Sequence, residues 1–280
     1  MSDNKKKYYF RKSRKKYFLE SGFRGFFCTC NYREKDCVKE AYNLLNEYAD
    51  KLVTVVKPDK PCEEVDISEE VKSDSTSEED TDIGDLLKQE VQDIKKNSRK
   101  SLNDKRFQAV ETGASNCVFI KTNLSDPDEL ASSIFKDLLV TKTQKTRHLL
   151  RLIPIMSTCK ANLPDIMECA GRLFDRFFLK TSSTFAIIFN KRFNNSVSRD
   201  LIIKELADLI VLKNNGNKAD LKNPHFSVIV EIIKGICLLS IVENYYTFKK
   251  YNLVEICKTE IQDDSEESQA KKKKIVEIVT

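Results

Sequence analysis

The stretch 183–211, STFAIIFNKRFNNSVSRDLIIKELADLIV, combines three elements in direct succession. Residues 185–189 form an apolar run rich in Phe and Ile, which predicts a buried strand. The basic, amide-rich segment 190–196 is typical of an exposed loop. From Ser198, a suitable N-cap, apolar residues recur at helical spacing and predict a helix. A strand, a basic loop and a helix N-terminus therefore follow one another.

This order of strand, basic loop and helix N-terminus is suited to binding a phosphate group. The first turn of a helix has backbone N–H groups without internal partners and carries the positive end of the helix dipole. Arg199 in the expected first turn, with Lys191 and Arg192 at the end of the strand, would add donors matched to phosphate oxygens. The alternative interpretation is that all three are ordinary solvated surface charges.

Composition restricts the class of protein. The chain has 280 residues, 40% apolar and 32% charged, enough for one or two globular domains with tails. No stretch approaches the roughly 18 to 20 apolar residues of a membrane span, and the basic N-terminus lacks the apolar core of a secretory signal. We therefore expect no membrane partner and an intracellular protein whose nine cysteines are reduced.

Charge is distributed unevenly around the net value of +5. Segment 5–16 has eight basic residues and no acid, whereas 63–85 has eleven acids against Lys72 alone. Segment 141–257 carries eighteen basic and ten acidic residues. This asymmetry indicates a polyanion-binding domain accompanied by an acidic segment. The basic arm is a candidate nuclear import signal, an RNA-contacting tail, or a solvated arm without a specific role.

Hydrophobic periodicity predicts an α+β chain with two domains. An N-terminal ferredoxin-like domain is expected over 17–57 and 105–140, split by a disordered acidic insertion at 58–104 that cannot bury enough apolar surface to order itself. An α/β domain follows over 141–257. The disordered ends are the arm 1–16 and the charged tail 258–280. The expected elements of the two domains are strand 22–30, helix 34–52, a hairpin within 107–122, a helix opened by Asp126 and Pro127, a β-like run over 148–159 that crosses into the second domain, a helix opened by Pro164, the 183–211 unit, and strands 226–233 and 236–242.

Two further patterns concern modification and metals. Ser75, Thr76 and Ser77 each precede an acid by three positions, which predicts phosphorylation by an acid-directed kinase. The cysteines at 28, 30 and 37 have the spacing C-x-C-x6-C, which differs from paired zinc-site spacings, and we interpret them as small apolar residues on a strand and the next helix. No metal is expected.

Sequence motifs of catalysis are absent. The chain has no G-x-G-x-x-G, no phosphate loop ending in G-K-[ST], no G-x-S-x-G and no H-E-x-x-H. His148 and His225 each lie beside an apolar strand and are interpreted as structural or surface residues. We therefore expect no enzyme activity and no cofactor.

Three segments, 145–161, 184–208 and 223–253, closely resemble the eukaryotic THUMP domain-containing adaptors of the tRNA cytidine acetyltransferase, and 25–50 with 110–121 resemble their N-terminal part. The resemblance implies that 141–257 is a THUMP domain that grips the acceptor stem and 3′ CCA end of tRNA. It also implies a non-catalytic partner of the RNA cytidine acetyltransferase, which presents serine and leucine tRNAs for N4-acetylcytidine formation in the D-arm. The expected location is the nucleus, at the nucleolus, with the cytoplasm as a further site.

The resemblance also extends the set of candidate RNA contacts. Arg192 and Arg199 match basic positions of the family in the loop and helix start, and Asn223 and Pro224 match in a flanking strand. Lys191 departs from the family, which tends to carry lysine one residue earlier, and such a shift reverses the face of a strand. The predicted RNA-binding residues are Arg192, Arg199, Lys191, Asn194, Asn195, Lys160, Arg147, Arg151 and Lys234.

Two other functions stay open at this point. A general RNA-binding or ribosome-assembly factor would not prefer tRNA with an intact 3′ end. A tRNA-modifying enzyme would bind a methyl donor or a nucleotide, for which the sequence shows no motif.

Overall fold

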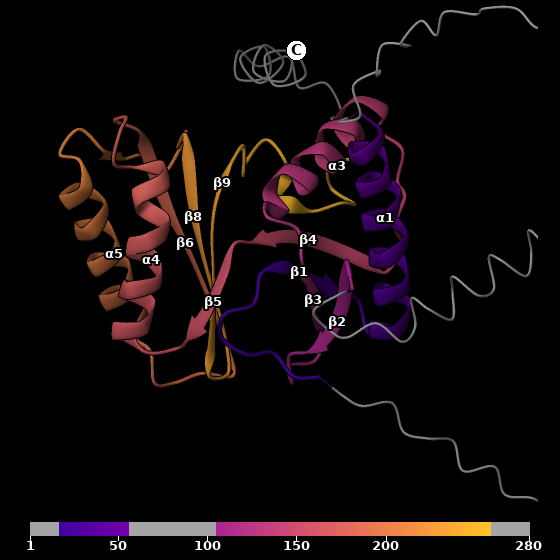
Figure 1. Cartoon of the computed structure of the whole chain (residues 1–280), viewed down its shortest axis with the longest axis horizontal. Coiled ribbons are helices and arrows are strands. Elements are labelled where there is room, and N and C mark those ends of the chain that lie inside the picture. Colours follow the sequence, from indigo (N-terminus) through magenta and orange to yellow (C-terminus); the bar gives the residue numbers. More distant parts are fainter. Residues whose placement is uncertain (1–16, 56–104, 259–280) are drawn as a thin grey trace, which may run out of the picture.

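The computed structural model describes residues 17–55 and 105–258 (Figure 1). The basic arm, the acidic insertion with its three predicted phosphorylation sites, and the tail after residue 258 lie outside the described residues. Within the described ranges the fold is mixed α/β, with two sheets and four α-helices. No helix in these ranges is both long enough and apolar enough to cross a bilayer.

The first sheet has the strand order β2-β3-β1-β4, and every neighbouring pair is antiparallel. Helices α1 and α3 pack against it (Figure 1). The expected start of α3 is confirmed, because Asp126 accepts the backbone N–H of Asp128 and Pro127 occupies the first turn. The elements are β1 Gly25–Cys30, α1 Glu34–Val55, β2 Phe107–Glu111, β3 Cys117–Thr122, α3 Pro127–Thr141 and β4 Leu149–Ile155.

The second sheet has the order β5-β9-β8-β6-β7, in which β6 runs parallel to β7 and β8 while β9 is antiparallel to β5 and β8. Helices α4 and α5 lie together on its outer side (Figure 1). The elements are β5 Ser157–Lys160, α4 Leu163–Phe177, β6 Thr184–Arg192, α5 Arg199–Lys213, β7 Lys218–Ala219, β8 Phe226–Ile233, β9 Ile236–Glu243 and the 3-10 turn η1 Lys249–Tyr251.

The β-like run predicted over 148–159 is two strands in two different sheets. Residues up to Ile155 pair with β1, and residues from Ser157 pair with β9. Met156 lies between them and donates its backbone N–H to the Leu239 carbonyl at 3.1 Å. The run therefore passes from the first sheet to the second, as the sequence predicts, but the position of the crossing was not predicted because apolar continuity does not report a change of hydrogen-bonding partner.

Strand β8 is buried along its whole length. Val228 and Val230 face the core under α4 and α5, whereas Ile229 and Ile233 face the core of the first sheet. A strand covered on both faces reads as a continuous apolar run, which is what the sequence shows. The second sheet is therefore the middle layer of the molecule.

Strand β6 is longer than the apolar run that predicts it. Residues 190–192, expected in an exposed loop, pair in register with Glu231, Ile232 and Ile233 of β8. The parallel ladder continues past the last apolar residue, so Lys191 and Arg192 are strand residues. Ser198 takes the extended N-cap conformation before α5, but its side chain makes no capping hydrogen bond.

Candidate nucleic-acid interface

The loop between β6 and α5 is held by its own polar side chains. The Asn194 side chain donates from Nδ2 to the Lys234 carbonyl at 2.7 Å and accepts at Oδ1 from the Val197 backbone N–H at 3.0 Å. The Lys191 ammonium donates to the Val197 carbonyl at 3.2 Å. Asn194 therefore organises the loop, whereas Asn195 is exposed beside it.

Three of the predicted cations are exposed and available at this end of the sheet. Arg199 begins α5, Lys160 ends β5, and Lys234 lies in the β8–β9 turn. Backbone hydrogen bonds join these segments, from Lys234 to the Arg192 carbonyl at 2.9 Å and from Ala161 to the Gly235 carbonyl at 2.9 Å. The side chains of all three cations make no hydrogen bond or ion pair within the described ranges.

Arg192 points into the seam between the two sheets. Its Nε lies 3.9 Å from Oε2 of Glu231, its Nη1 lies 3.6 Å from the Cys117 sulfur, and its guanidinium carbon lies 5.6 Å from the centre of the Phe27 ring. The side chain is 36% exposed, so it is partly covered rather than free. Both Arg192 and Arg199 are predicted from the sequence to contact RNA, but in the structure Arg192 is partly covered whereas Arg199 is exposed.

Glu231 is the buried carboxylate opposite Arg192. It is 1% exposed and accepts a hydrogen bond from the Asn190 side chain at 2.7 Å. Burial raises the pKa of Glu231, while the Asn190 hydrogen bond and the charges of Arg192 and Arg151 act in the opposite direction. Arg151 is half-buried on β4. Arg151 and Arg192 therefore contribute charge to a polar cluster between the sheets.

Arg147 lies outside this grouping, at the start of β4 and beside α1. Glu40 of α1 accepts the backbone N–H groups of Arg147, His148 and Leu149 at 3.1, 2.8 and 2.9 Å through a single oxygen. The Arg147 side chain is exposed. The carboxylate fixes the backbone of the strand start, and nothing in this arrangement links Arg147 to the loop at the end of β6.

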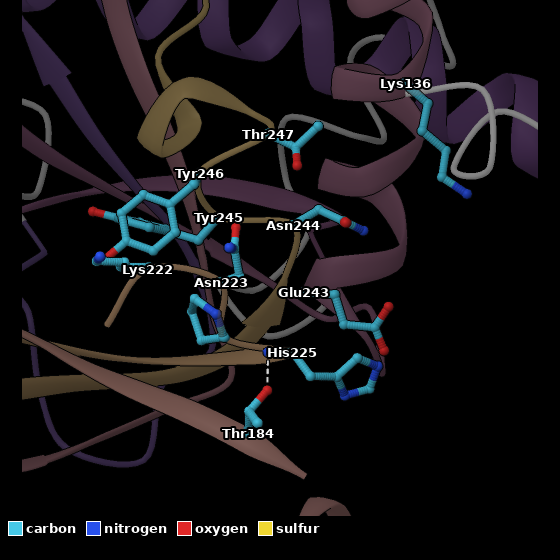
Figure 2. Close-up of a pocket in the computed structure, with 11 residues that line it drawn as sticks. Lys136, Thr184, Lys222, Asn223, His225, Glu243, Asn244, Tyr245, Tyr246 and Thr247 are labelled. Atoms are coloured by element: carbon cyan, nitrogen blue, oxygen red, sulfur yellow. Dashed lines mark hydrogen bonds between the residues drawn. The ribbon is translucent and has the colours of Figure 1, made fainter. Parts of the chain in front are cut away.

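A cavity of about 530 Å³ opens at the opposite end of β6 (Figure 2). It lies between Lys136 of α3, the segment before β8, and the segment after β9, so the second sheet and a helix of the first unit contribute to it. Sequence reasoning missed this site, although the Asn223-Pro224-His225 turn and the aromatic pair after β9 were visible. Only the pairing of β8 with β9 brings those two segments together.

The cysteine cluster has the structural role that the sequence predicts. Cys28 and Cys30 lie on β1 and Cys37 lies on α1, and all three are buried. Burial raises the pKa of each thiol. No group of three or more His, Cys, Asp or Glu side chains in the described ranges could hold a metal ion.

Residues 160–242, from the end of β5 into β9, match the family model of the THUMP domain. The layer formed by the second sheet with α4 and α5 is therefore a THUMP domain, and its β6–α5 loop and the far end of β6 both fall within that range.

The chain belongs to the family of THUMP domain-containing protein 1. It is 42% identical over 275 residues to the Drosophila melanogaster homolog, covering 96% of this chain and 84% of that protein. It spans about two thirds of the length of the mammalian relatives that it matches. The Saccharomyces cerevisiae tRNA acetyltransferase TAN1 is 26% identical over 271 residues, 90% of each chain. The solution structure of a THUMP domain of THUMP domain-containing protein 1 is 38% identical, covers 28% of this chain and 81% of its own, and has a TM-score of 0.27.

Proposed function

We propose that this chain is a non-catalytic tRNA-binding adaptor that presents tRNA to an RNA cytidine acetyltransferase for N4-acetylcytidine formation. The observation that carries the proposal is the set of exposed cations at the Arg192 end of β6. Arg199, Lys160 and Lys234 have no hydrogen-bond or ion-pair partner within the described residues, so their charges are available to a polyanion. Membership of the THUMP domain-containing protein 1 family and the likeness to a yeast protein named as a tRNA acetyltransferase support tRNA as that polyanion.

The physical basis of binding is phosphate neutralisation. Arg199 lies in the first turn of α5, where unpaired backbone N–H groups and the helix dipole also favour an anion. Lys160 at the end of β5 and Lys234 in the β8–β9 turn add two more charges at the same end of the sheet, where β9 lies between β5 and β8. Contacts of this kind position RNA without reading its sequence, and they weaken steeply as salt rises.

The finer parts of the proposal follow the family resemblance. The tRNA regions contacted are the acceptor stem and the 3′ CCA end, the substrates are serine and leucine tRNAs, the modified site is in the D-arm, and the protein acts in the nucleus and nucleolus. The first unit is proposed to be ferredoxin-like. Its β-α-β-β-α-β succession in the described residues and its antiparallel order β4-β1-β3-β2 support that assignment.

The adaptor role is tested by nucleoside mass spectrometry of purified tRNA and ribosomal RNA from cells with and without this protein. We expect N4-acetylcytidine to disappear from tRNA and to remain in ribosomal RNA, because the acetyltransferase itself stays intact. Unchanged acetylation of tRNA would refute the proposal. Loss from both RNAs would instead indicate a general role in RNA binding or ribosome assembly.

A second measurement separates an adaptor from an enzyme. Purified chain, incubated with tRNA, acetyl-CoA and ATP, is expected to form no N4-acetylcytidine until a purified acetyltransferase is added. Product formed by the chain alone would show that it is itself catalytic.

A further inference from the structure

We propose that the pocket in Figure 2 binds one unstacked nucleotide of a single-stranded RNA segment, with Tyr246 as the stacking surface. This inference rests on the proposed RNA binding and deepens it. The pocket lies at the Thr184 end of β6, and the free cations lie at the other end of the same strand. The two regions would therefore contact different parts of one RNA.

The pocket has the size of a small-ligand site, and its lining is more polar than is usual for one. Its volume of about 530 Å³ falls within the range of roughly 300–1,000 Å³ that such sites occupy. It is lined mostly by lysine, asparagine, threonine and glutamate side chains and by aromatic rings, and Pro224 is the one aliphatic side chain in the lining. A nucleotide presents the same mixture, since it has a flat ring, hydrogen-bonding edges and a charged phosphate.

Tyr246 is presented to the pocket by a rigid turn. Its side chain is 39% exposed, while Tyr245 behind it is 5% exposed and meets it edge to face, with ring centres 5.3 Å apart and an interplanar angle of 84°. Asn244 turns the chain after β9 with a left-handed φ of 56°, which asparagine tolerates better than most residues. Backbone hydrogen bonds from Phe248 to the Asn244 carbonyl and from Lys250 to the Tyr245 carbonyl close the turn.

The opposing wall is also fixed before any ligand arrives. Thr184 accepts the backbone N–H of His225 at 2.9 Å, drawn as the dashed line in Figure 2. Asp220 accepts the backbone N–H groups of Lys222 and Asn223 at 2.8 and 3.0 Å. A preformed wall reduces the entropy lost on binding, so the site is suited to a ligand held by few contacts.

Each charged side chain of the pocket is suited to a different part of a nucleotide. Lys136 and Lys222 line it and have no side-chain partner within the described residues, so both are available to a phosphate. Glu243, drawn with His225 on the other side of the pocket from Tyr246 in Figure 2, is an acceptor suited to an amino group of a base or a ribose hydroxyl. Stacking on Tyr246 does not select a base, whereas Glu243 favours bases that carry an amino group.

The test compares wild type with Tyr246→Ala and with Tyr246→Phe, which keeps the ring. Binding is measured for one RNA stem with blunt ends, with a single-stranded 3′ end and with a single-stranded 5′ end. Tyr246→Ala is expected to weaken binding of an RNA with a single-stranded end by about 5- to 100-fold and to leave the blunt stem unchanged, whereas Tyr246→Phe stays close to wild type. Whichever end shows the loss is the end that the pocket holds.

The outcomes separate this inference from the proposed function. If wild type binds the stem but gains nothing from either single-stranded end, or if Tyr246→Ala weakens all three RNAs equally, the pocket assignment fails and RNA binding stands. If wild type binds no RNA, the proposed function fails and the pocket assignment fails with it. Should Tyr246→Ala not fold, Lys222→Ala decides, because loss of binding restricted to RNAs with a single-stranded end supports the pocket and an equal loss on all three RNAs refutes it.

Discussion

The two ends of β6 differ in how the protein uses its polar side chains. At the Arg192 end, three of the residues that the sequence predicts as RNA contacts are engaged within the protein. Arg192 faces a buried carboxylate, and Lys191 and Asn194 form hydrogen bonds inside their own loop. At the Thr184 end, Lys222 and Tyr246 are exposed, although no role was predicted for them from the sequence. The difference shows that residue type predicts which side chains could contact RNA. Whether such a side chain is available depends on the hydrogen bonds and ion pairs that it makes within the protein.

The largest expected effect tests whether Arg199 and Arg192 differ in their availability to RNA. The measurement is the salt dependence of tRNA binding by Arg199→Ala and Arg192→Ala. Arg199→Ala is expected to weaken binding by about 1 to 3 kcal/mol for all tRNAs alike and to reduce the slope of log K against log salt by about 1, because one phosphate contact is lost. Arg192→Ala is expected to leave that slope unchanged. If the two slopes fell equally, both arginines would contact phosphate and the distinction would be refuted.

The second prediction concerns the free energy of unfolding. Arg192→Met keeps an aliphatic side chain at the seam but removes one of the two cations near buried Glu231. We expect a loss of about 2 kcal/mol, below the full cost of breaking a buried pair because Arg192 is 36% exposed and the charge of Arg151 remains. The measurement is urea unfolding. Combining Arg192→Met with Glu231→Gln should recover part of the loss, and purely additive effects would show that the two side chains do not interact.

The third prediction concerns how the free energy of unfolding depends on pH through Asp128 of α3. Burial and the nearby charge of Asp126 raise the pKa of Asp128 from 3.8 to about 7, while the Tyr251 hydroxyl, at 3.3 Å, acts in the opposite direction. The folded state therefore holds this proton to higher pH than the unfolded state, so its contribution to stability falls as pH rises from about 4 to 7. Asp128→Asn should remove that fall and should be more stable than wild type by about 1 kcal/mol at pH 8. Urea unfolding at pH 5 and pH 8 measures the difference, and equal pH profiles for the two proteins would contradict it.

The smallest expected effect separates two neighbouring asparagines in the loop. Asn194→Ala removes three hydrogen bonds, at 2.7, 3.0 and 3.4 Å, and is expected to cost about 0.5 to 1 kcal/mol of unfolding free energy. Asn195→Ala is the matched control and should stay within about 0.5 kcal/mol of wild type, because its exposed side chain has no such role. Thermal unfolding of both variants makes the comparison, and equal losses would show that the loop does not depend on Asn194.

Local signals predicted most of the elements but not their partners. The Asp126-Pro127 pair predicted the start of α3, and the apolar runs predicted β8 and β9, because capping and burial act on adjacent residues. The extension of β6 to Arg192 was not predicted, because it depends on a ladder with a strand about forty residues away. For the same reason Glu231 gave no signal as the partner of Arg192. The loop, helix start and cations were named from the sequence, whereas the pocket arises from segments that meet only in the fold.

The junction at Met156 bears on how the molecule can move. A hinge needs a few residues free to change their backbone angles, but here one residue joins two strands and its own N–H is bonded to β9. The two sheets are therefore expected to turn as one body. The nine residues of β6 separate the two candidate contact regions by roughly 26 Å, at about 3.3 Å per residue. The distance between the two contact regions is therefore fixed, and an RNA binds both only if its phosphates and its unstacked nucleotide are the same distance apart.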